Sequence, residues 1–182
     1  MIPQSVNQPG STGQLTTPHQ ACASADVPAA ANPPAAAAPL LVLDTNVCLD
    51  LFVFHDPRWE RLLLALQQGR VRAVTRLDCK TEWQTVLGYR QLPLDDVSRA
   101  AAVAAFDALI ACHEFAPVHG IVLPRCSDGD DQKFLELARD AKASCLISKD
   151  KALLKLGRKT RQAGLFNILL PQAWLAGYSD GL

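Results

Sequence analysis

The sequence predicts an α/β fold, a three-layer α/β/α sandwich with a mainly parallel central sheet. Residues 40–43 and 145–148 form two short apolar runs without polar alternation, which is typical of strands buried on both faces. Each run delivers a carboxylate, Asp44 after the first and Asp150 after the second. Segments with helical periodicity lie between the runs, and strands that alternate with helices favour a parallel sheet.

The chain has 182 residues, enough for one domain with its own core. Its formal net charge is zero, so nucleic-acid binding would have to come from a local patch of charge. No apolar run approaches the ~20 residues that span a bilayer, and the N-terminus lacks the features of a secretory signal. We therefore expect a cytoplasmic protein without a membrane partner, whose six scattered cysteines are reduced, buried thiols rather than zinc ligands.

Residues 1–39 differ in composition from the rest of the chain. They contain no Lys or Arg and seven of the twelve prolines. A segment rich in Ala and Pro, without bulky apolar side chains, cannot offset the entropy lost on ordering. We expect a disordered or extended tail over residues 1–39, unless the start codon is misassigned, and a globular domain over residues 40–182.

Apolar spacing and chain breakers predict the remaining elements in order. The helices are expected at residues 47–53, from about 58 to 69, from an N-cap at Asp78 to 88, from 94 to about 112, from the acidic turn at 126–131 onward, and after residue 150, where the helix is basic. Further strands are expected at residues 71–74 and 166–169, with irregular or edge-strand chain at 115–118 and 121–123 and a terminal turn around residue 174.

Acidic residues stand out by their context in these elements. They are Asp44 and Asp150 after buried strands, Glu82 inside the third helix, and Asp131 at a helix N-terminus beside Asp128 and Asp130. No Ser–His or Cys–His pair accompanies them, and carboxylates without soft ligands suit Mg²⁺ or Mn²⁺. Two such ions about 3.5–4 Å apart can activate a water against a phosphodiester.

Each acid also has an ordinary structural interpretation. Taken singly, Asp44 and Asp150 fit helix caps better than metal ligands, and Glu82 fits a solvated helix residue. The acids at residues 128–131 fit a turn and a first helical turn that complement the helix dipole. What favours a metal site is the conjunction of two strand-end acids with an acidic cluster.

The segments around these acids resemble those of PIN domains. Residues 41–47 (LVLDTNV) are similar to the opening motif, residues 126–138 (CSDGDDQKFLELA) to the third acidic segment, and residues 145–154 (CLISKDKALL) to the closing strand and acid. The resemblance covers about residues 40–175 and is closest to the VapC-like group associated with toxin–antitoxin systems. It implies an α/β/α sandwich with ribonuclease activity that depends on Mg²⁺ or Mn²⁺.

The resemblance also implies roles for individual residues. By position, the catalytic and metal-binding acids are Asp44, Glu82, Asp131 and Asp150. Asp128 and Asp130 are alternatives for the third ligand, and we prefer Asp131 because it lies one turn before the apolar face of its helix. Glu82 is identified only by its place after the second strand. Asn46 and Ser148 match the polar residues that support Asp44 and Asp150.

Basic residues crowd into positions 149–161 beside the last acid: Lys149, Lys151, Lys155, Arg158, Lys159 and Arg161. One interpretation is phosphate binding next to the metal site, and the other is a solvated helix face. On the first interpretation the RNA contacts are Lys149, Lys151, Lys155 and Arg158.

The leading hypothesis is a metal-dependent endoribonuclease, the toxin of a toxin–antitoxin pair. Its substrate is RNA, and its candidate partners are a cognate antitoxin and a second copy of the chain. The alternative is a non-catalytic PIN-like module that binds RNA or a protein. A phosphatase of the haloacid dehalogenase type is disfavoured because it requires an Asp where this chain has Asn46. A signalling receiver domain is disfavoured because its acid pair normally precedes the strand end that carries the phosphorylated residue.

Overall fold

A computed structural model describes residues 38–178, so almost all of the predicted tail lies outside the described residues. Five strands form one sheet: β1 (Leu40–Leu43), β2 (Arg72–Thr75), β3 (Ile110–Cys112), β4 (Cys145–Ile147) and β5 (Asn167–Leu169). Their order is β3-β2-β1-β4-β5, and every neighbouring pair is parallel. The predicted α/β class with a mainly parallel sheet is confirmed.

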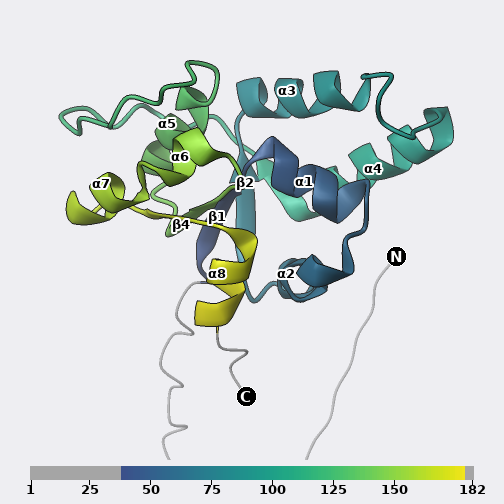
Figure 1. The fold of residues 1–182 in the computed structure, drawn as a ribbon, viewed down its shortest axis with the longest axis horizontal. Coiled ribbons are helices and arrows are strands. Elements are labelled where there is room, and N and C mark those ends of the chain that lie inside the picture. Colours follow the sequence, from purple (N-terminus) through teal and green to yellow (C-terminus); the bar gives the residue numbers. More distant parts are fainter. Residues whose placement is uncertain (1–37, 179–182) are drawn as a thin grey trace, which may run out of the picture. The chain divides into compact units, whose positions relative to one another are not determined.

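Helices cover both faces of this sheet (Figure 1). They are α1 (Thr45–Phe52), the 3-10 turn η1 (Pro57–Trp59), α2 (Glu60–Gln67), α3 (Leu77–Leu87), α4 (Asp96–Leu109), α5 (Gln132–Asp140), α6 (Lys151–Leu154), α7 (Gly157–Gln162) and α8 (Pro171–Gly177). The helices α1, α2 and α4 pack on one face, and α5, α6 and α7 pack on the other. The α/β/α sandwich follows from this division.

Alternation along β1 divides the core into two halves. Leu41 and Leu43 join a cluster with the side chains of α1, α2 and α4, whereas Val42 between them joins a cluster with those of α5 to α7. Successive side chains of a strand point to opposite faces, so a strand with helices on both sides needs apolar residues at every position. The helix α3 contributes to both halves, with Trp83 in the first and Cys79 in the second.

Four details of the predicted elements are wrong. Residues 171–177, expected as a terminal turn around residue 174, form the helix α8. The N-cap of α3 is Arg76 rather than Asp78, whose carboxylate lies in the first turn and binds the Arg76 guanidinium instead. The helix predicted to reach about residue 112 ends at Leu109, because residues 110–112 pair with β2 as the edge strand β3. The basic helix is divided into α6 and α7; at Gly157 a Cβ would lie 3.0 Å from the Ile168 carbonyl oxygen, so the first residue of α7 lies close against β5.

The strand order reverses between β1 and β4, the two strands that precede Asp44 and Asp150. The register pairs Leu43 with Ile147, and the Asp44 N–H donates to the Ile147 carbonyl oxygen at 3.0 Å. Residues that follow these two strands therefore lie side by side. In open α/β sheets, ligands bind at the carboxyl ends of strands at such a reversal.

Five of the six cysteines lie among the described residues, where their burial can be compared with the expectation from the sequence. The thiols of Cys48, Cys79, Cys126 and Cys145 are free and buried. The expectation of a buried thiol is wrong for Cys112, which is free but exposed on β3, and Cys22 lies outside the described residues. Within residues 38–178, none of the helices combines the length and the hydropathy that crossing a membrane requires.

Candidate active site

Asp44 lies at the end of β1 and is only 3% exposed. Its Oδ2 accepts hydrogen bonds from Asn46 Nδ2 at 2.6 Å and from Ser148 Oγ at 2.5 Å. Burial raises the pKa of the Asp44 carboxyl, and the two hydrogen bonds oppose that rise without cancelling it. Although Asp44 stands at the N-cap position of α1, its side chain makes no capping hydrogen bond. Its orientation is set by side chains rather than by its own helix.

Asp150 follows β4 and does cap a helix. Its Oδ1 accepts from the backbone N–H groups of Ala152 at 2.6 Å and Leu153 at 3.1 Å, at the start of α6. Ser148 connects this acid to Asp44, because its Oγ also accepts from the Asp150 N–H at 2.9 Å. The capping interpretation thus describes Asp150 and does not describe Asp44.

Asp131 lies at the N-terminus of α5, where its side chain is half-buried. Burial, followed by the negative charges of Asp44, Asp150, Asp128 and Glu82, raises its pKa to about 7. Repulsion between carboxylates falls off over a few ångströms in a partly shielded site. The charges of the three other predicted acids, which come from three other segments of the chain, therefore act on the environment of Asp131.

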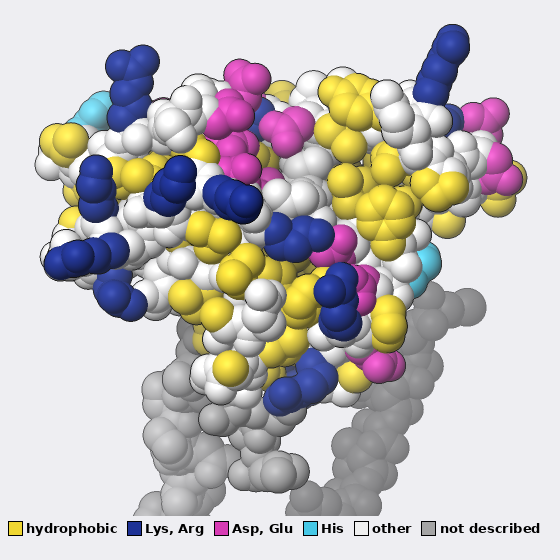
Figure 2. Space-filling model, viewed as in Figure 1, with side chains coloured by type: hydrophobic (Ala, Val, Ile, Leu, Met, Phe, Trp, Pro, Cys, Tyr) yellow, Lys and Arg dark blue, Asp and Glu magenta, His cyan; other side chains and the backbone are white. Residues whose placement is uncertain are grey.

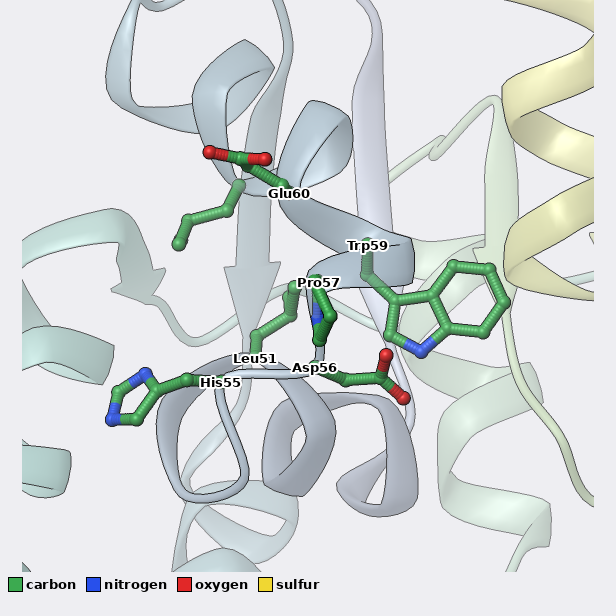
Figure 3. Close-up of a pocket in the computed structure, with 7 residues that line it drawn as sticks. Leu51, His55, Asp56, Pro57, Trp59 and Glu60 are labelled. Atoms are coloured by element: carbon green, nitrogen blue, oxygen red, sulfur yellow. The ribbon is translucent and has the colours of Figure 1, made fainter.

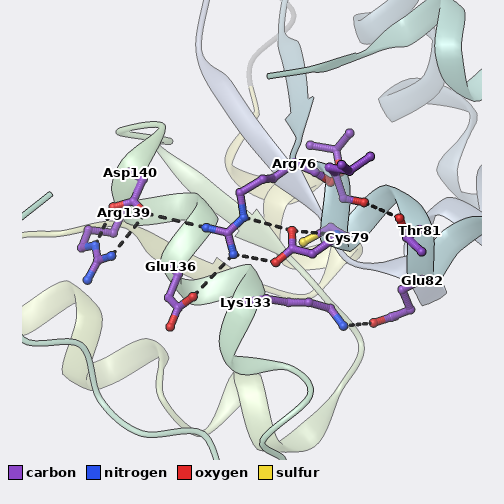
Figure 4. Close-up of polar contacts among 11 residues, drawn as sticks. Arg76, Cys79, Thr81, Glu82, Lys133, Glu136, Arg139 and Asp140 are labelled. Atoms are coloured by element: carbon purple, nitrogen blue, oxygen red, sulfur yellow. Dashed lines mark hydrogen bonds and ion pairs between the residues drawn. The ribbon is translucent and has the colours of Figure 1, made fainter. Parts of the chain in front are cut away.

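Glu82 reaches this environment from α3, with both carboxylate oxygens engaged. Its Oε1 accepts from Thr45 Oγ1 at 2.6 Å, and its Oε2 pairs with Lys133 Nζ at 2.5 Å (Figure 4). Burial alone would lower the pKa of the Lys133 ammonium, but the hydrogen bond and charge of Glu82 raise it. Sequence reasoning missed Thr45 and Lys133, because both contacts join segments that only the tertiary fold brings together.

Comparison with known proteins assigns the chain to a family. A family model described as PIN domain matches residues 40–152, which is more than half of the chain and spans all four acids. The chain belongs to the PIN domain family. Among solved structures, a chain of VapBC2 from Rickettsia felis, crystallised bound to a DNA fragment from its promoter, is similar with a TM-score of 0.47 and 12% identity, over 72% of this chain and 98% of that one. No curated protein matches the sequence.

The acidic turn that precedes α5 in this PIN domain separates its three aspartates by exposure. Asp128 and Asp130 are exposed, and the Asp128 Oδ1 accepts from the Asp130 N–H at 3.0 Å, as in a turn. Asp131 is half-buried, and burial together with the charges of other acids raises its pKa to about 7. This difference favours Asp131 over its two neighbours as the third acid of the site.

The donor set of the PIN domain fits a hard divalent cation. The acids offer only oxygen atoms, which suit such an ion. Burial, and then repulsion from the other acids, raises the Asp131 pKa, and a bound cation would offset that repulsion. Across residues 38–178, no three carboxylate, thiol or imidazole groups already stand in a metal-binding arrangement. Binding an ion would therefore require side-chain rotation, for which the half-buried Glu82 and Asp131 have more freedom than the buried Asp44.

Lys and Arg side chains lie beside Asp and Glu side chains on one face of the PIN domain (Figure 2). Lys151 of α6, Lys155 just after α6 and Arg158 of α7 are exposed, as a phosphate-binding role requires. Lys149 differs, because its ammonium pairs with the Asp50 carboxylate at 2.6 Å. Asp50 is buried and also accepts from Trp59 Nε1 at 3.0 Å, a contact that the sequence did not reveal.

A separate hollow of about 270 Å³ lies between α1 and the η1–α2 segment. His55, Asp56, Pro57 and Trp59 are among its lining residues, and Figure 3 shows their side chains around it. None of the four acids lines this hollow. It is therefore distinct from the carboxylate site of the PIN domain.

Proposed function

We propose that this PIN domain is a metal-dependent endoribonuclease that hydrolyses RNA phosphodiesters. The observation that supports it best is the position of Asp44 and Asp150 after the neighbouring parallel strands β1 and β4, where the strand order reverses. Burial, and then the charges of Asp44, Asp150, Asp128 and Glu82, raise the pKa of Asp131 to about 7. Buried and half-buried carboxylates near this reversal of strand order repel one another, and a bound cation would offset that repulsion.

In this proposal Asp44, Glu82, Asp131 and Asp150 hold Mg²⁺ or Mn²⁺. When bound, the ion supplies Lewis-acid activation of the phosphodiester and of an attacking water. Asn46 and Ser148 fix the orientation of Asp44 through their bonds to its Oδ2. Lys151, Lys155 and Arg158 bind the RNA backbone by charge, which positions the strand without reading its sequence.

Cleavage of single-stranded RNA, followed on gels with purified protein, tests the activity. We expect cleavage with Mg²⁺ or Mn²⁺, none in EDTA, and a rate at least about 100-fold lower in Asp44→Asn, which keeps the size of the side chain but removes a ligand charge. Asp107→Asn is the matched control, because Asp107 is an acid on α4 that pairs with Lys80 instead.

Two results would contradict the proposal in different ways. Cleavage that persists in EDTA, or at the unmodified rate in Asp44→Asn, would exclude the metal mechanism. Tight RNA binding without cleavage under any divalent ion would favour the non-catalytic module.

We further propose that the nuclease acts in the cytoplasm as the toxin of a toxin–antitoxin pair. Support comes from the resemblance of residues 41–47 and 126–138 to the VapC-like group. Its partner would be a small antitoxin protein encoded in the neighbouring reading frame. Expression in bacteria should arrest growth, Asp44→Asn should not, and co-expression of the neighbouring frame should restore growth. Normal growth with an active nuclease would exclude the toxin role and leave the activity intact.

A further inference from the structure

Lys133 is a basic residue whose ammonium lies on one of the four acids. It lies two residues after Asp131, the N-cap residue of α5. From there its side chain reaches Glu82 on α3 (Figure 4). We propose that Lys133 is a positioning residue, an internal counter-ion that holds Glu82 in the metal-free protein and must release it when a divalent cation binds. The inference rests on the proposed function.

The ion pair is close and partly shielded from solvent. Lys133 Nζ lies 2.5 Å from Glu82 Oε2, and the two side chains are only 22% and 28% exposed. The ammonium also lies 5.7 Å from the centre of the Phe134 ring, so an aromatic face replaces water on one side of it. An ion pair in such a place is screened less by salt than one on an open surface.

Both carboxylate oxygens of Glu82 are therefore engaged by other side chains. Thr45 Oγ1 takes its Oε1 and the Lys133 ammonium takes its Oε2. The hydroxyl of Thr45 is neutral and can keep donating to a carboxylate that also binds a cation. The ammonium is positively charged, so it and a divalent ion on the same carboxylate repel each other.

Through this ion pair the chain itself provides a positive charge to one of the four acids. Lys133 thereby offsets part of the carboxylate repulsion before any metal arrives, and it lowers the affinity for the metal that follows. Electrostatic repulsion between the Lys133 ammonium and a divalent ion at this partly shielded position should decrease the affinity for the ion about tenfold.

Calorimetric titration of the full chain with Mn²⁺ tests the inference without any measurement of catalysis. We expect Lys133→Met to bind Mn²⁺ about tenfold more tightly than the unmodified protein. Lys80→Met is the matched control, because Lys80 on α3 pairs with Asp107 at 2.6 Å and is 21% exposed. Both variants lack an ion pair between helices and should melt at a lower temperature in EDTA, but only Lys133→Met should gain affinity.

A double-mutant cycle separates action through Glu82 from a general decrease in positive charge. In the Glu82→Gln background the carboxylate charge that Lys133 holds is gone, so most of the gain from Lys133→Met should disappear. Lys133→Arg keeps the charge and should bind Mn²⁺ as the unmodified protein does. If Lys133→Met does not fold, Lys133→Gln replaces it in the same cycle.

Each result decides the matter. Equal or weaker Mn²⁺ binding in Lys133→Met than in the unmodified protein would overturn the counter-ion role and leave the proposed nuclease standing. A gain that persists in full in the Glu82→Gln background would also overturn it, because Lys133 would then act on the ion without Glu82. No Mn²⁺ binding in the unmodified protein would overturn both proposals.

Discussion

Ser148 Oγ, at the end of β4, donates a hydrogen bond of 2.5 Å to Asp44 Oδ2, at the end of β1. The two residues are 104 positions apart in the sequence, and the parallel register of β1 and β4 brings them together. Ser148 is fully buried and Asp44 nearly so. This hydrogen bond therefore links the two central strands at the point where the buried acid is oriented.

Ser148→Ala should lower both stability and metal affinity. The Asp44 carboxylate would be deprived of a buried donor, which typically costs about 1–3 kcal/mol of the free energy of unfolding. Removal of a residue that orients a metal ligand typically weakens metal binding by about 10–100-fold. Urea denaturation in EDTA gives the first quantity, and Mn²⁺ titration gives the second.

Ser144→Ala is the control for this substitution. Ser144 lies just before the same strand, and its Oγ donates to the Leu40 carbonyl oxygen at 2.9 Å in an exposed position. Its removal should change stability by about 0.5 kcal/mol or less and leave Mn²⁺ affinity unaltered. Equal effects of the two alanine substitutions would show that the Ser148 bond has no special role.

The raised pKa of Asp131 makes the stability of the metal-free protein depend on pH. The folded state holds a proton on this carboxyl up to a pKa of about 7, whereas the ordinary value is 3.8. An acid with a raised folded-state pKa binds protons more readily folded than unfolded, so its contribution is present at low pH and is lost as pH rises from about 4 to about 7. In EDTA the urea midpoint should fall across this window.

Asp131→Asn should flatten that fall, because the amide does not titrate. Saturating Mn²⁺ should likewise abolish it in the unmodified protein, since the cation favours the charged carboxylate. Urea midpoints at about pH 5 and about pH 7.5, on either side of most of this titration, provide the measurement for both proteins with EDTA and with Mn²⁺. The same pH dependence in both proteins would mean that Asp131 titrates normally.

Arg76 makes stability depend on pH in the direction opposite to that of Asp131, because its contribution is lost as pH falls. Its hydrogen bond lowers the pKa of Asp78 to about 2, and its guanidinium also reaches Glu136 at 3.4 Å and Asp140 at 3.8 Å (Figure 4). An acid with a lowered folded-state pKa stabilises the fold above its ordinary value, 3.8, and that contribution is lost as pH falls toward about 2.

Arg76→Met should therefore move acid unfolding to higher pH, as followed by circular dichroism from about pH 5 to about pH 1.5. Arg58→Met is the comparison, because Arg58 also pairs with an acid two residues away, Asp56, but at an exposed position and without a link between helices. Its effect should be small. An unchanged acid midpoint in Arg76→Met would mean that the network joining α3 to α5 adds nothing to stability at low pH.

The sequence predicts some parts of this site and not others, for physical reasons. Asp44 and Asp150 are recognisable because a buried strand and its following residue are local in sequence. Their different roles are not: Asp150 caps α6, while Asp44 is held by Ser148 from another strand. Likewise the sequence does not predict β3, because its three residues become a strand only by pairing with β2.

Partners of side chains are the least predictable level. The pairs Lys133–Glu82 and Lys149–Asp50 join segments whose proximity depends on helix packing. Periodicity predicts which face of α5 is buried, but it does not state which acid a lysine beside that face will meet. Lys149 shows the consequence, since its charge suggested RNA binding and its ammonium is engaged by a buried aspartate.

The remaining exposed basic residues allow the RNA-binding hypothesis to be tested apart from catalysis. Lys155 and Arg158 are exposed on the α6–α7 segment, so reversing both charges should not disturb the core. Lys155→Glu with Arg158→Glu should weaken binding of single-stranded RNA and reduce the slope of log affinity against log salt by about 0.7 for each phosphate that is no longer neutralised. Fluorescence anisotropy in EDTA, at several salt concentrations, measures affinity without cleavage.

Arg90→Glu is the control, because Arg90 is exposed after α3, far along the chain from α6 and α7. It should leave the salt slope unchanged, whereas the double reversal should lower it by about 1.4 if both residues bind phosphates. Mn²⁺ affinity should be the same in all three proteins, since exposed charges are screened by salt. An unaltered RNA affinity in the double variant would mean that the basic helices are a solvated face, and the search for the RNA path would move to other parts of the PIN domain.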